Sequence, residues 1–208
     1  MLSPDTFLLF LTASLLLCIA PGPDNIFVLT QSMLRGSSAG ILVTLGLCTG
    51  LLVHTTAVAL GVAVIFQQSL LAFTILKLCG AAYLLYLAWG AFRAGAGGLG
   101  SMQTETLKKN VLYRRGIVMN ITNPKVSIFF LAFLPQFADP ASGHLKLQLM
   151  ALGGIFIVCT LLVFGVISLL AGRLGNWFSR SPGAEVVMNK IAGRVFAALA
   201  VKLALTER

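Results

Sequence analysis

Charged residues are scarce in this chain. Only 10% of its 208 residues are Asp, Glu, Lys or Arg, and 58% are hydrophobic, whereas about 25% of the residues in a soluble domain are charged. The mean hydropathy is +0.94. There is too little polar sequence for a separate soluble domain, so the composition predicts a polytopic membrane protein whose helical bundle is the whole functional unit.

Cysteines and the common catalytic motifs are few or missing as well. The four cysteines all fall in apolar stretches without a CxxC pair, so we interpret them as small hydrophobic residues rather than as disulfides or metal ligands. They are Cys18, Cys48, Cys79 and Cys159. No GxxxxGK(S/T), GxSxG or HExxH pattern is present, which argues against an ATP-driven machine or a hydrolase. We expect no cofactor, no bound metal and no enzymatic activity.

The first apolar stretch lacks the marks of a secretory signal peptide. Asp5 is the only charge before it, and no small-x-small cleavage site follows. We therefore expect residues 7–20 to begin a transmembrane helix. Six apolar runs in all reach the length of roughly 20 residues that a bilayer requires. They cover residues 6–34, 40–66, 69–92, 115–134, 146–172 and 186–206.

Basic residues gather in alternate connections between these runs. The formal net charge is +9, and most of the Lys and Arg residues lie in the first, third and fifth connections. These residues are Arg35, Arg93, Lys108, Lys109, Arg114, Arg115, Arg173, Arg180 and Lys190. Because basic loops stay in the cytoplasm, both termini are predicted to lie outside. These basic residues thus set the orientation of the chain in the membrane and contact lipid headgroups, and we expect no nucleic acid partner.

The six runs divide into two halves of three. Pro23-Asp24 in the first half matches Pro124-Lys125 in the second, and Lys77-x-x-Gly80 matches Lys190-x-x-Gly193. With an odd number of spans in each half, the second half must insert upside down relative to the first, which is an inverted repeat. The predicted architecture is a single all-α membrane domain over residues 1–208, with repeat 1 at about 5–93, a Gly-rich cytoplasmic linker at about 94–113 and repeat 2 at about 114–206.

Prolines interrupt the matched first helix of each half. Pro23 lies in Pro21-Gly22-Pro23-Asp24-Asn25, and Pro124 lies in Asn123-Pro124-Lys125. Proline lacks an N–H and clashes with the carbonyl one turn back, so the first and fourth helices should break, with an unwound stretch at residues 21–25. Lipid tolerates such breaks only where protein or a water-filled cavity takes up the freed backbone groups. An acid at one break and a base at the other predict a polar site near the midplane.

Asp24 and Lys125 approach each other if the two-fold axis passes between the breaks. One interpretation is structural: a buried ion pair that locks the first and fourth helices together. The other is functional, because these groups suit a zwitterion. Asp24 and loose carbonyls at residues 21–25 would bind the ammonium of an amino acid, and Lys125 with the amides of Asn120 or Asn123 would bind its carboxylate. The residues alone leave both interpretations open.

Two further polar residues lie within the apolar runs. His54 is either a buried neutral histidine or a group that couples transport to protons. Lys77 lies deep in the third run, although its long stem could reach the interface. The candidate substrate-binding or coupling residues are Pro21, Gly22, Pro23, Asp24, Asn25, His54, Lys77, Asn120, Asn123, Pro124 and Lys125.

These motifs resemble those of the LysE/RhtB family of bacterial amino-acid exporters. The similarity rests on the segments 21–24 and 120–125 and on the run from Lys77 to Leu87, and it extends from about residue 5 to about residue 205. The resemblance implies a secondary transporter of six helices in the bacterial cytoplasmic (inner) membrane, which exports amino acids or related metabolites. It further implies proton antiport by alternating access, with an amino acid, protons and the lipid bilayer as partners.

Two other functions stay open as alternatives. A divalent-cation exporter would need more ligands than the one acid and two histidines that the chain offers. A transmembrane thiol-disulfide carrier would place a cysteine beside each break, where this chain has Asp24 and Lys125. A homodimer is compatible with the predicted bundle.

Overall fold

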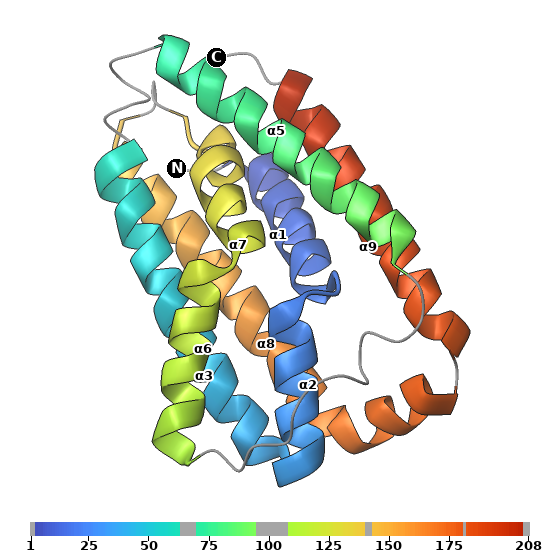
Figure 1. Cartoon of the computed structure of the whole chain (residues 1–208). Helices are drawn as coiled ribbons and strands as arrows, with labels where there is room; N and C mark the ends of the chain where they lie inside the picture. The colour runs from blue at the N-terminus through green and yellow to red at the C-terminus, as the bar shows by residue number, and fades with distance from the viewer. Residues whose placement is uncertain (1–2, 63–69, 95–107, 140–142, 181, 206–208) are drawn as a thin grey trace.

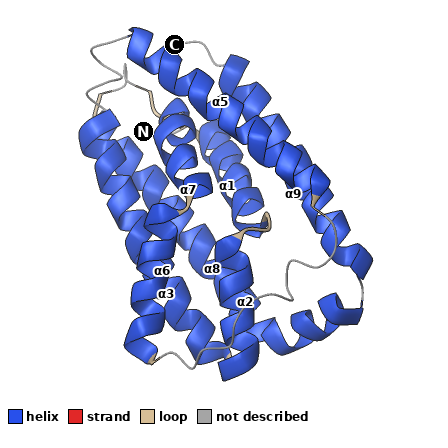
Figure 2. Ribbon diagram, in the orientation of Figure 1, coloured by secondary structure: helices blue, strands red, loops and turns tan. Residues whose placement is uncertain are grey.

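The structure is a computed structural model, and it describes residues 3–62, 70–94, 108–139, 143–180 and 182–205. These residues form helices joined by short connections, and there is no β-strand among them (Figure 2). The α-helices are α1 (Pro4–Ile19), α2 (Pro23–Arg35), α3 (Ser37–Ala57), α5 (Leu70–Arg93), α6 (Lys109–Thr122), α7 (Pro124–Ile128), α8 (Leu145–Arg180) and α9 (Pro182–Leu205). The π-helix η1 (Val58–Val62) continues α3, and the π-helix η2 (Phe129–Phe133) and the 3-10 helix η3 (Leu134–Phe137) continue α7.

The first predicted span consists of two helices, as the prolines require. α1 ends at Ile19, α2 begins at Pro23, and the two are bent by 59°. Proline suits the first position of a helix because its N–H would be unpaired there and its φ is already helical. The break is therefore shorter than predicted. Asp24 and Asn25 are not unwound but form the first turn of α2, because Pro23 starts a helix as well as ending one.

The fourth predicted span is broken in the same way. α6 ends at Thr122, α7 begins at Pro124, and the two segments are bent by 50°. The predicted break at Pro124 is confirmed. The chain beyond it does not form a regular α-helix, since it passes into η2 and η3. Such single turns of π-helix often mark functional sites.

The described helices give three to five candidate membrane spans. Three stretches are long and apolar enough by themselves, and up to five spans result if each bent pair counts as one. The three stretches are Ser37–Gly61, Thr74–Arg93 and Leu145–Ala171. The last predicted run, 186–206, is helical in α9. Because α9 contains four charged residues, it is not among the candidate spans. The structure thus supports an all-helical membrane protein, and the number six stays a prediction.

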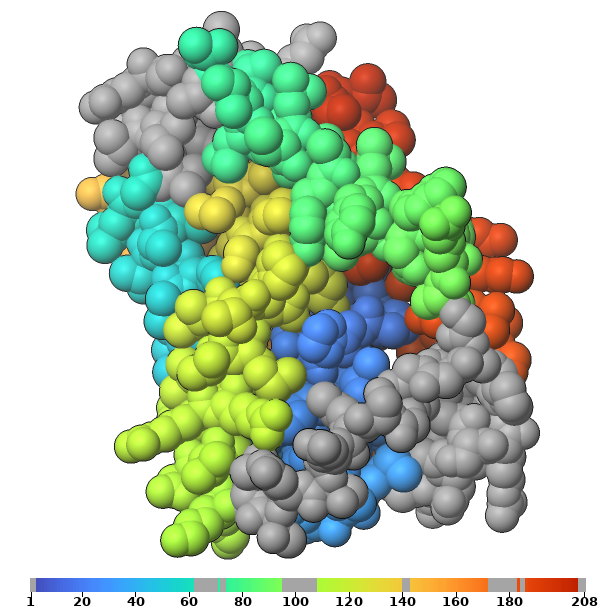
Figure 3. Space-filling view, in the orientation of Figure 1, coloured from blue at the N-terminus to red at the C-terminus, as the bar shows by residue number. Residues whose placement is uncertain are grey.

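The two breaks lie in the middle of the bundle. In Figure 1, α1 and α7 occupy one half of the molecule, and α2 and α6 occupy the other. α3 packs along α6 and α8, α8 also packs against α1 and α2, and α5 packs along α9. The space-filling view shows the first broken helix (blue) between α6–α7 (yellow-green to yellow) and the pair of α5 and α9 (Figure 3). The Gly-rich stretch at 95–105 lies outside the described residues, and α6 begins at Lys109, inside the predicted linker.

α3 and α6 approach closely because each has a glycine at their crossing. A Cβ added to Gly46 would meet the backbone carbonyl of Tyr113, and one added to Gly116 would meet the carbonyl of Val43. Small residues permit such close approach of helices in membranes. A Cβ added to Gly50 would overlap the side chain of Asn120. α3 thus holds the end of α6 in position at the second break.

Gly46→Ala is expected to loosen this crossing. The added methyl group must displace the α6 backbone, and overpacking of this kind costs about 1–3 kcal/mol of folding free energy. Gly90→Ala is the matched control, because nothing lies within 4 Å of a Cβ at Gly90. Thermal unfolding in detergent should give a lower Tm for Gly46→Ala than for Gly90→Ala. Equal Tm values would contradict the close crossing.

Buried phenylalanines fill the half that contains α1 and α7. The ring centroid of Phe129 lies 5.0 Å from that of Phe133 and 5.2 Å from that of Phe156 on α8. Phe10 of α1 joins this cluster through Phe137, at 5.1 Å. Tilted and edge-on ring pairs add to the stabilisation from apolar burial. Phe156 also lines the cavity at the two breaks, so the cluster adjoins that cavity.

Candidate functional site

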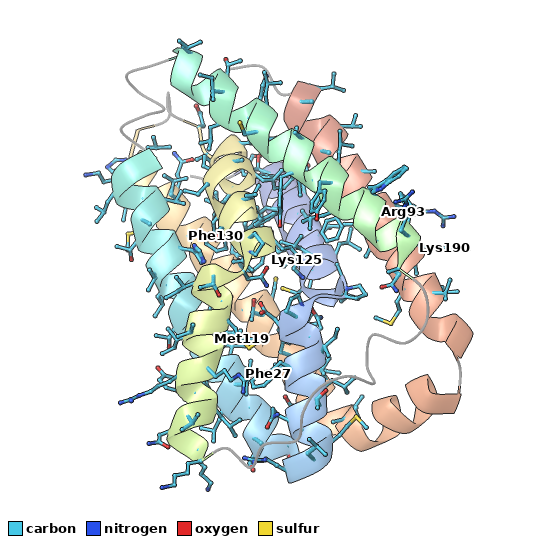
Figure 4. The ribbon with its side chains drawn as sticks, in the orientation of Figure 1. Phe27, Arg93, Met119, Lys125, Phe130 and Lys190 are labelled. Atoms are coloured by element: carbon cyan, nitrogen blue, oxygen red, sulfur yellow. The ribbon has the colours of Figure 1, made fainter. Side chains whose placement is uncertain are left out.

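The first break frees carbonyl groups at the end of α1. In a continuous helix the carbonyl oxygen of Leu17 would accept from the N–H of residue 21, but residue 21 is a proline. The Nζ of Lys125 donates to this oxygen at 3.3 Å and to the carbonyl oxygen of Ala20 at 3.1 Å. A cation at this end of a helix also interacts favourably with the helix dipole. Lys125, which is 7% exposed, therefore caps α1 from the other half of the chain (Figure 4).

A second side chain covers the same helix end. The Nδ2 of Asn25 donates to the carbonyl oxygen of Cys18 at 2.7 Å. The freed carbonyls of the first break thus lie at residues 17, 18 and 20, before the predicted stretch 21–25. They are paired within the protein, because Asn25 and Lys125, each just after a break, reach back to them.

The second break repeats this arrangement. Pro124 lacks the N–H that the carbonyl oxygen of Asn120 would accept, and the Nε2 of His54 donates to that oxygen at 3.2 Å. The N–H of Asn123 donates to it as well, at 3.1 Å. The half-buried ring of His54 lies 5.6 Å from the ring of Phe130, which Figure 4 labels. At both breaks a side chain from another helix pairs with the carbonyl four residues before the proline.

Asn123 joins the two breaks. Its Oδ1 accepts from the backbone N–H of Lys125 at 3.0 Å, which caps α7. Its Nδ2 donates to the Oδ2 of Asp24 at 2.9 Å. Asp24 is buried in the first turn of α2, where the positive end of the helix dipole favours an anion. One amide therefore ties the start of α2 to the start of α7.

Asn123→Ala is expected to weaken this tie. Loss of an N-cap costs about 1 kcal/mol, and the carboxylate of Asp24 loses a donor in addition. Asn110→Ala, at an exposed position of α6, is the control. Thermal unfolding in detergent should show a lower Tm for Asn123→Ala and an unchanged one for Asn110→Ala. A wild-type Tm for Asn123→Ala would show that the amide does not hold the breaks together.

Asp24 and Lys125 share one site but do not bind each other. The described residues contain no salt bridge between them, because the carboxylate is bound by Asn123 and the ammonium by the end of α1. The plain ion pair that the sequence allows is thus not formed. Both residues line a cavity of about 20 Å³, which has room for about one water molecule.

The cavity is bounded by both breaks and by α3 and α8. Its lining is Leu17, Cys18, Asp24, Leu47, Asn120, Lys125, Val126, Phe156, Thr160 and Phe164. Three side-chain oxygens at the breaks are buried without a donor among the described residues: Oδ1 of Asp24, of Asn25 and of Asn120. Buried acceptors without donors are rare. Those of Asp24 and Asn120 belong to residues that line the cavity, and each can accept from a donor that enters it.

Comparison with known proteins identifies the family. The family model described as LysE type translocator matches residues 15–207. The chain belongs to the LysE type translocator family. A homoserine/homoserine lactone efflux protein of Salmonella typhimurium is 36% identical over 196 residues, which cover 94% of each chain. An uncharacterized membrane protein of Vibrio cholerae is 31% identical over 97% of each chain. A leucine efflux protein of Salmonella choleraesuis is 26% identical, over 95% of this chain and 94% of the relative. No solved structure matches.

The structure brings most of the predicted site residues of this LysE type translocator together. Residues that line the cavity or contact the breaks are Gly22, Asp24, Asn25, His54, Asn120, Asn123 and Lys125. Pro21, Pro23 and Pro124 create the breaks, and Pro23 and Pro124 are themselves exposed. Lys77 is half-buried on α5 and does not line the cavity. The described residues hold no group of three His, Cys, Asp or Glu side chains that could bind a metal ion.

Sequence reasoning missed what α8 contributes to this translocator. Phe156, Thr160 and Phe164 line the cavity, as does Cys18, whose Sγ lies 3.5 Å from the Oγ1 of Thr160. The available signal was a spacing of four residues within the run 146–172, which places all three α8 residues on one face of a helix. On that face a polar threonine lies between two phenylalanines, and this is the pattern that could have indicated the cavity.

Proposed function

We propose that this translocator is a secondary exporter of amino acids or closely related metabolites in the bacterial cytoplasmic membrane. The observation that supports this best is the meeting of two helix breaks at one small cavity, with an acid and a base that do not pair with each other. Transporters place their substrate at such breaks near the bilayer midplane. The relatives named as efflux proteins for homoserine and for leucine support an amino acid as the cargo.

An amino acid zwitterion complements the groups of the cavity. Its ammonium would bind the free Oδ1 atoms of Asp24 and Asn120, two of the residues that line the cavity. Its carboxylate would attract the ammonium of Lys125 away from the carbonyl oxygens of α1, because a hydrogen bond between two charged groups is stronger than one to a neutral carbonyl. Since Lys125 caps α1 when it is bound there, its transfer to substrate would free α1 to move. Substrate binding would thereby be coupled to a movement of α1 at the first break.

Six spans in two inverted repeats are the arrangement that we propose for the chain. The packing supports it, because α3 contacts α8 and α5 contacts α9, which are the matched helices of the two halves. α3 also contacts the second broken helix, just as α8 contacts the first. The start of α1 and the end of α9 lie at one end of the bundle, and the basic ends of α2 and α6 lie at the other (Figure 1). Both termini would then face outward.

Transport would proceed by alternating access with proton antiport. One repeat rocks against the other around the fixed site, so the site opens first to one side and then to the other. A proton and the substrate ammonium compete for the carboxylate of Asp24, which would make binding of one depend on release of the other. His54 lies beside the second break, where it would take part in this proton exchange. The phenylalanine cluster would keep the outer side closed while the cytoplasmic side is open.

Everted membrane vesicles test this function. Labelled amino acids, offered one by one, should accumulate in respiring vesicles that contain the chain and not in vesicles that lack it. Nigericin, which collapses the pH gradient, should abolish the accumulation. Accumulation that nigericin leaves unchanged would reject proton antiport. Failure of every amino acid, together with accumulation of a labelled divalent cation, would reject the amino acid exporter in favour of a cation exporter.

A further inference from the structure

A cation lies over an aromatic ring on one side of the cavity. The guanidinium carbon of Arg115 on α6 is 5.0 Å from the ring centroid of Phe27 on α2. The ring is buried, with an exposed fraction of 2%, whereas Arg115 is exposed. A guanidinium over the face of a ring is attracted by the negative charge of that face. The contact therefore holds α2 and α6 together.

This contact lies between the cavity and the basic ends of α2 and α6. On α2, Phe27 follows the cavity residue Asp24 by three residues, so the two are neighbours on the helix surface. On α6, Arg115 precedes the cavity residue Asn120 by more than one helical turn. Figure 4 shows Phe27 below Lys125, toward the same ends. A path that runs from these ends to Asp24 between α2 and α6 passes the contact.

The site is closed in this structure. The cavity holds about 20 Å³, which is room for about one water molecule and not for an amino acid. Cys18, which lines the cavity, has an exposed fraction of 3%. A substrate can therefore reach Asp24 and Lys125 only after helices separate on one side of the cavity.

The opposite side is held by a larger set of contacts. The ring centroid of Phe137 lies 5.0 Å from that of Phe133 and 5.1 Å from that of Phe10, and the Nζ of Lys202 lies 4.3 Å from the same ring. Between α2 and α6, by contrast, the described residues show one cation–π contact, and these helices touch over a short stretch. The side of α2 and α6 thus requires fewer contacts to break.

We propose that the contact between Arg115 and Phe27 is the cytoplasmic gate of the site. While it is intact, the path between α2 and α6 is closed, and it separates when substrate enters from the cytoplasm. This direction of entry rests on the proposed exporter. One cation–π contact is weak, so this side opens more readily than the phenylalanine cluster. Arg115 is already exposed, so its charge stays in water when the gate opens and no buried charge is left behind.

The thiol of Cys18 provides a reporter for this gate. In a protein that carries Cys48→Ala, Cys79→Ala and Cys159→Ala, Cys18 is the single cysteine. The membrane-impermeant thiol reagent MTSET, added to everted vesicles, reaches the chain from its cytoplasmic face. The rate at which MTSET blocks Cys18 is measured by the loss of its later reaction with a fluorescent maleimide after denaturation. Because Cys18 is buried in the closed site, this rate reports opening.

Arg115→Gln and Phe27→Leu should each raise the labelling rate about fivefold, the effect of one lost cation–π contact on the opening equilibrium. The double variant should show about the same increase as each single variant, because both changes remove one shared contact. Arg114→Gln removes the same charge from the neighbouring, exposed position of α6. It is the control and should keep the rate of the parent protein. Arg115→Gln changes an exposed residue, so it tests the gate even if Phe27→Leu fails to fold.

Equal labelling rates for Arg115→Gln and Arg114→Gln would overturn the gate. A faster rate for Arg115→Gln in right-side-out vesicles, without a change in everted ones, would overturn it as well, because the contact would then close the outer side. Labelling of Cys18 requires no transported amino acid. Failure of every amino acid in the transport assay would therefore reject the exporter, whereas the labelling rates alone decide whether Arg115 and Phe27 close the site.

Discussion

Asp24→Asn is expected to reduce export by at least about 30-fold, because loss of a buried charged contact costs about 2–5 kcal/mol. The Oδ1 of Asp24 has no donor among the described residues, so its charge is available to a substrate ammonium. An asparagine keeps an oxygen for the Nδ2 of Asn123, so the tie between the breaks should persist. The measurement is the initial rate of accumulation of labelled substrate in everted vesicles, normalised to the amount of inserted protein.

Asp5→Asn is the matched control for this variant. Asp5 is exposed in the first turn of α1, and its replacement should leave the transport rate unchanged. The Tm of Asp24→Asn in detergent should stay close to that of the wild type. Export by Asp24→Asn at the wild-type rate would refute the assignment of Asp24. A Tm that falls far below that of Asp5→Asn would instead give Asp24 a structural role.

Lys125→Met is expected to abolish export and also to destabilise the protein. The carbonyl oxygens of Leu17 and Ala20 lose their donor, and a buried acceptor left without one costs about 1–3 kcal/mol. The substrate carboxylate loses its cation at the same time. Two readouts are therefore required: the transport rate in everted vesicles, and the Tm of the purified protein in detergent.

Lys109→Met separates these effects from a general loss of positive charge. Lys109 is exposed at the start of α6, so its replacement should change neither readout. A Lys125→Met protein with normal transport would contradict the account. If its Tm were unchanged, the capping of α1 by Lys125 would be wrong even if transport were lost.

The positions of the breaks could be predicted from the prolines alone. Proline cannot donate to the carbonyl four residues before it, and this one rule identifies Leu17 for Pro21 and Asn120 for Pro124 as carbonyls in need of another donor. The structure shows such donors at both: Lys125 for the first and His54 for the second. The apolar composition likewise predicted an all-helical membrane protein. These predictions succeed because they follow from local covalent geometry and from average hydropathy.

The pairing of side chains across the breaks could not be predicted in this way. Lys125 has a long, flexible stem, and whether it reaches Asp24 or the end of α1 depends on how the two halves pack. The same holds for Asn123, whose amide bonds both the start of α2 and the start of α7. Thr160 was missed because the part of α8 around it contains neither a helix break nor a charged residue that would indicate a site. Its role depends on which face of α8 meets the cavity, and that is a matter of tertiary packing.

We propose that Asp24 and Lys125 are the two poles of a substrate site rather than charges that only balance each other. The double variant Asp24→Asn/Lys125→Met tests this claim, by the rate at which everted vesicles accumulate the labelled substrate. If the two charges bind the substrate, the double variant will be as inactive as each single variant. Recovery of transport toward the wild-type rate when both charges are removed would contradict the claim.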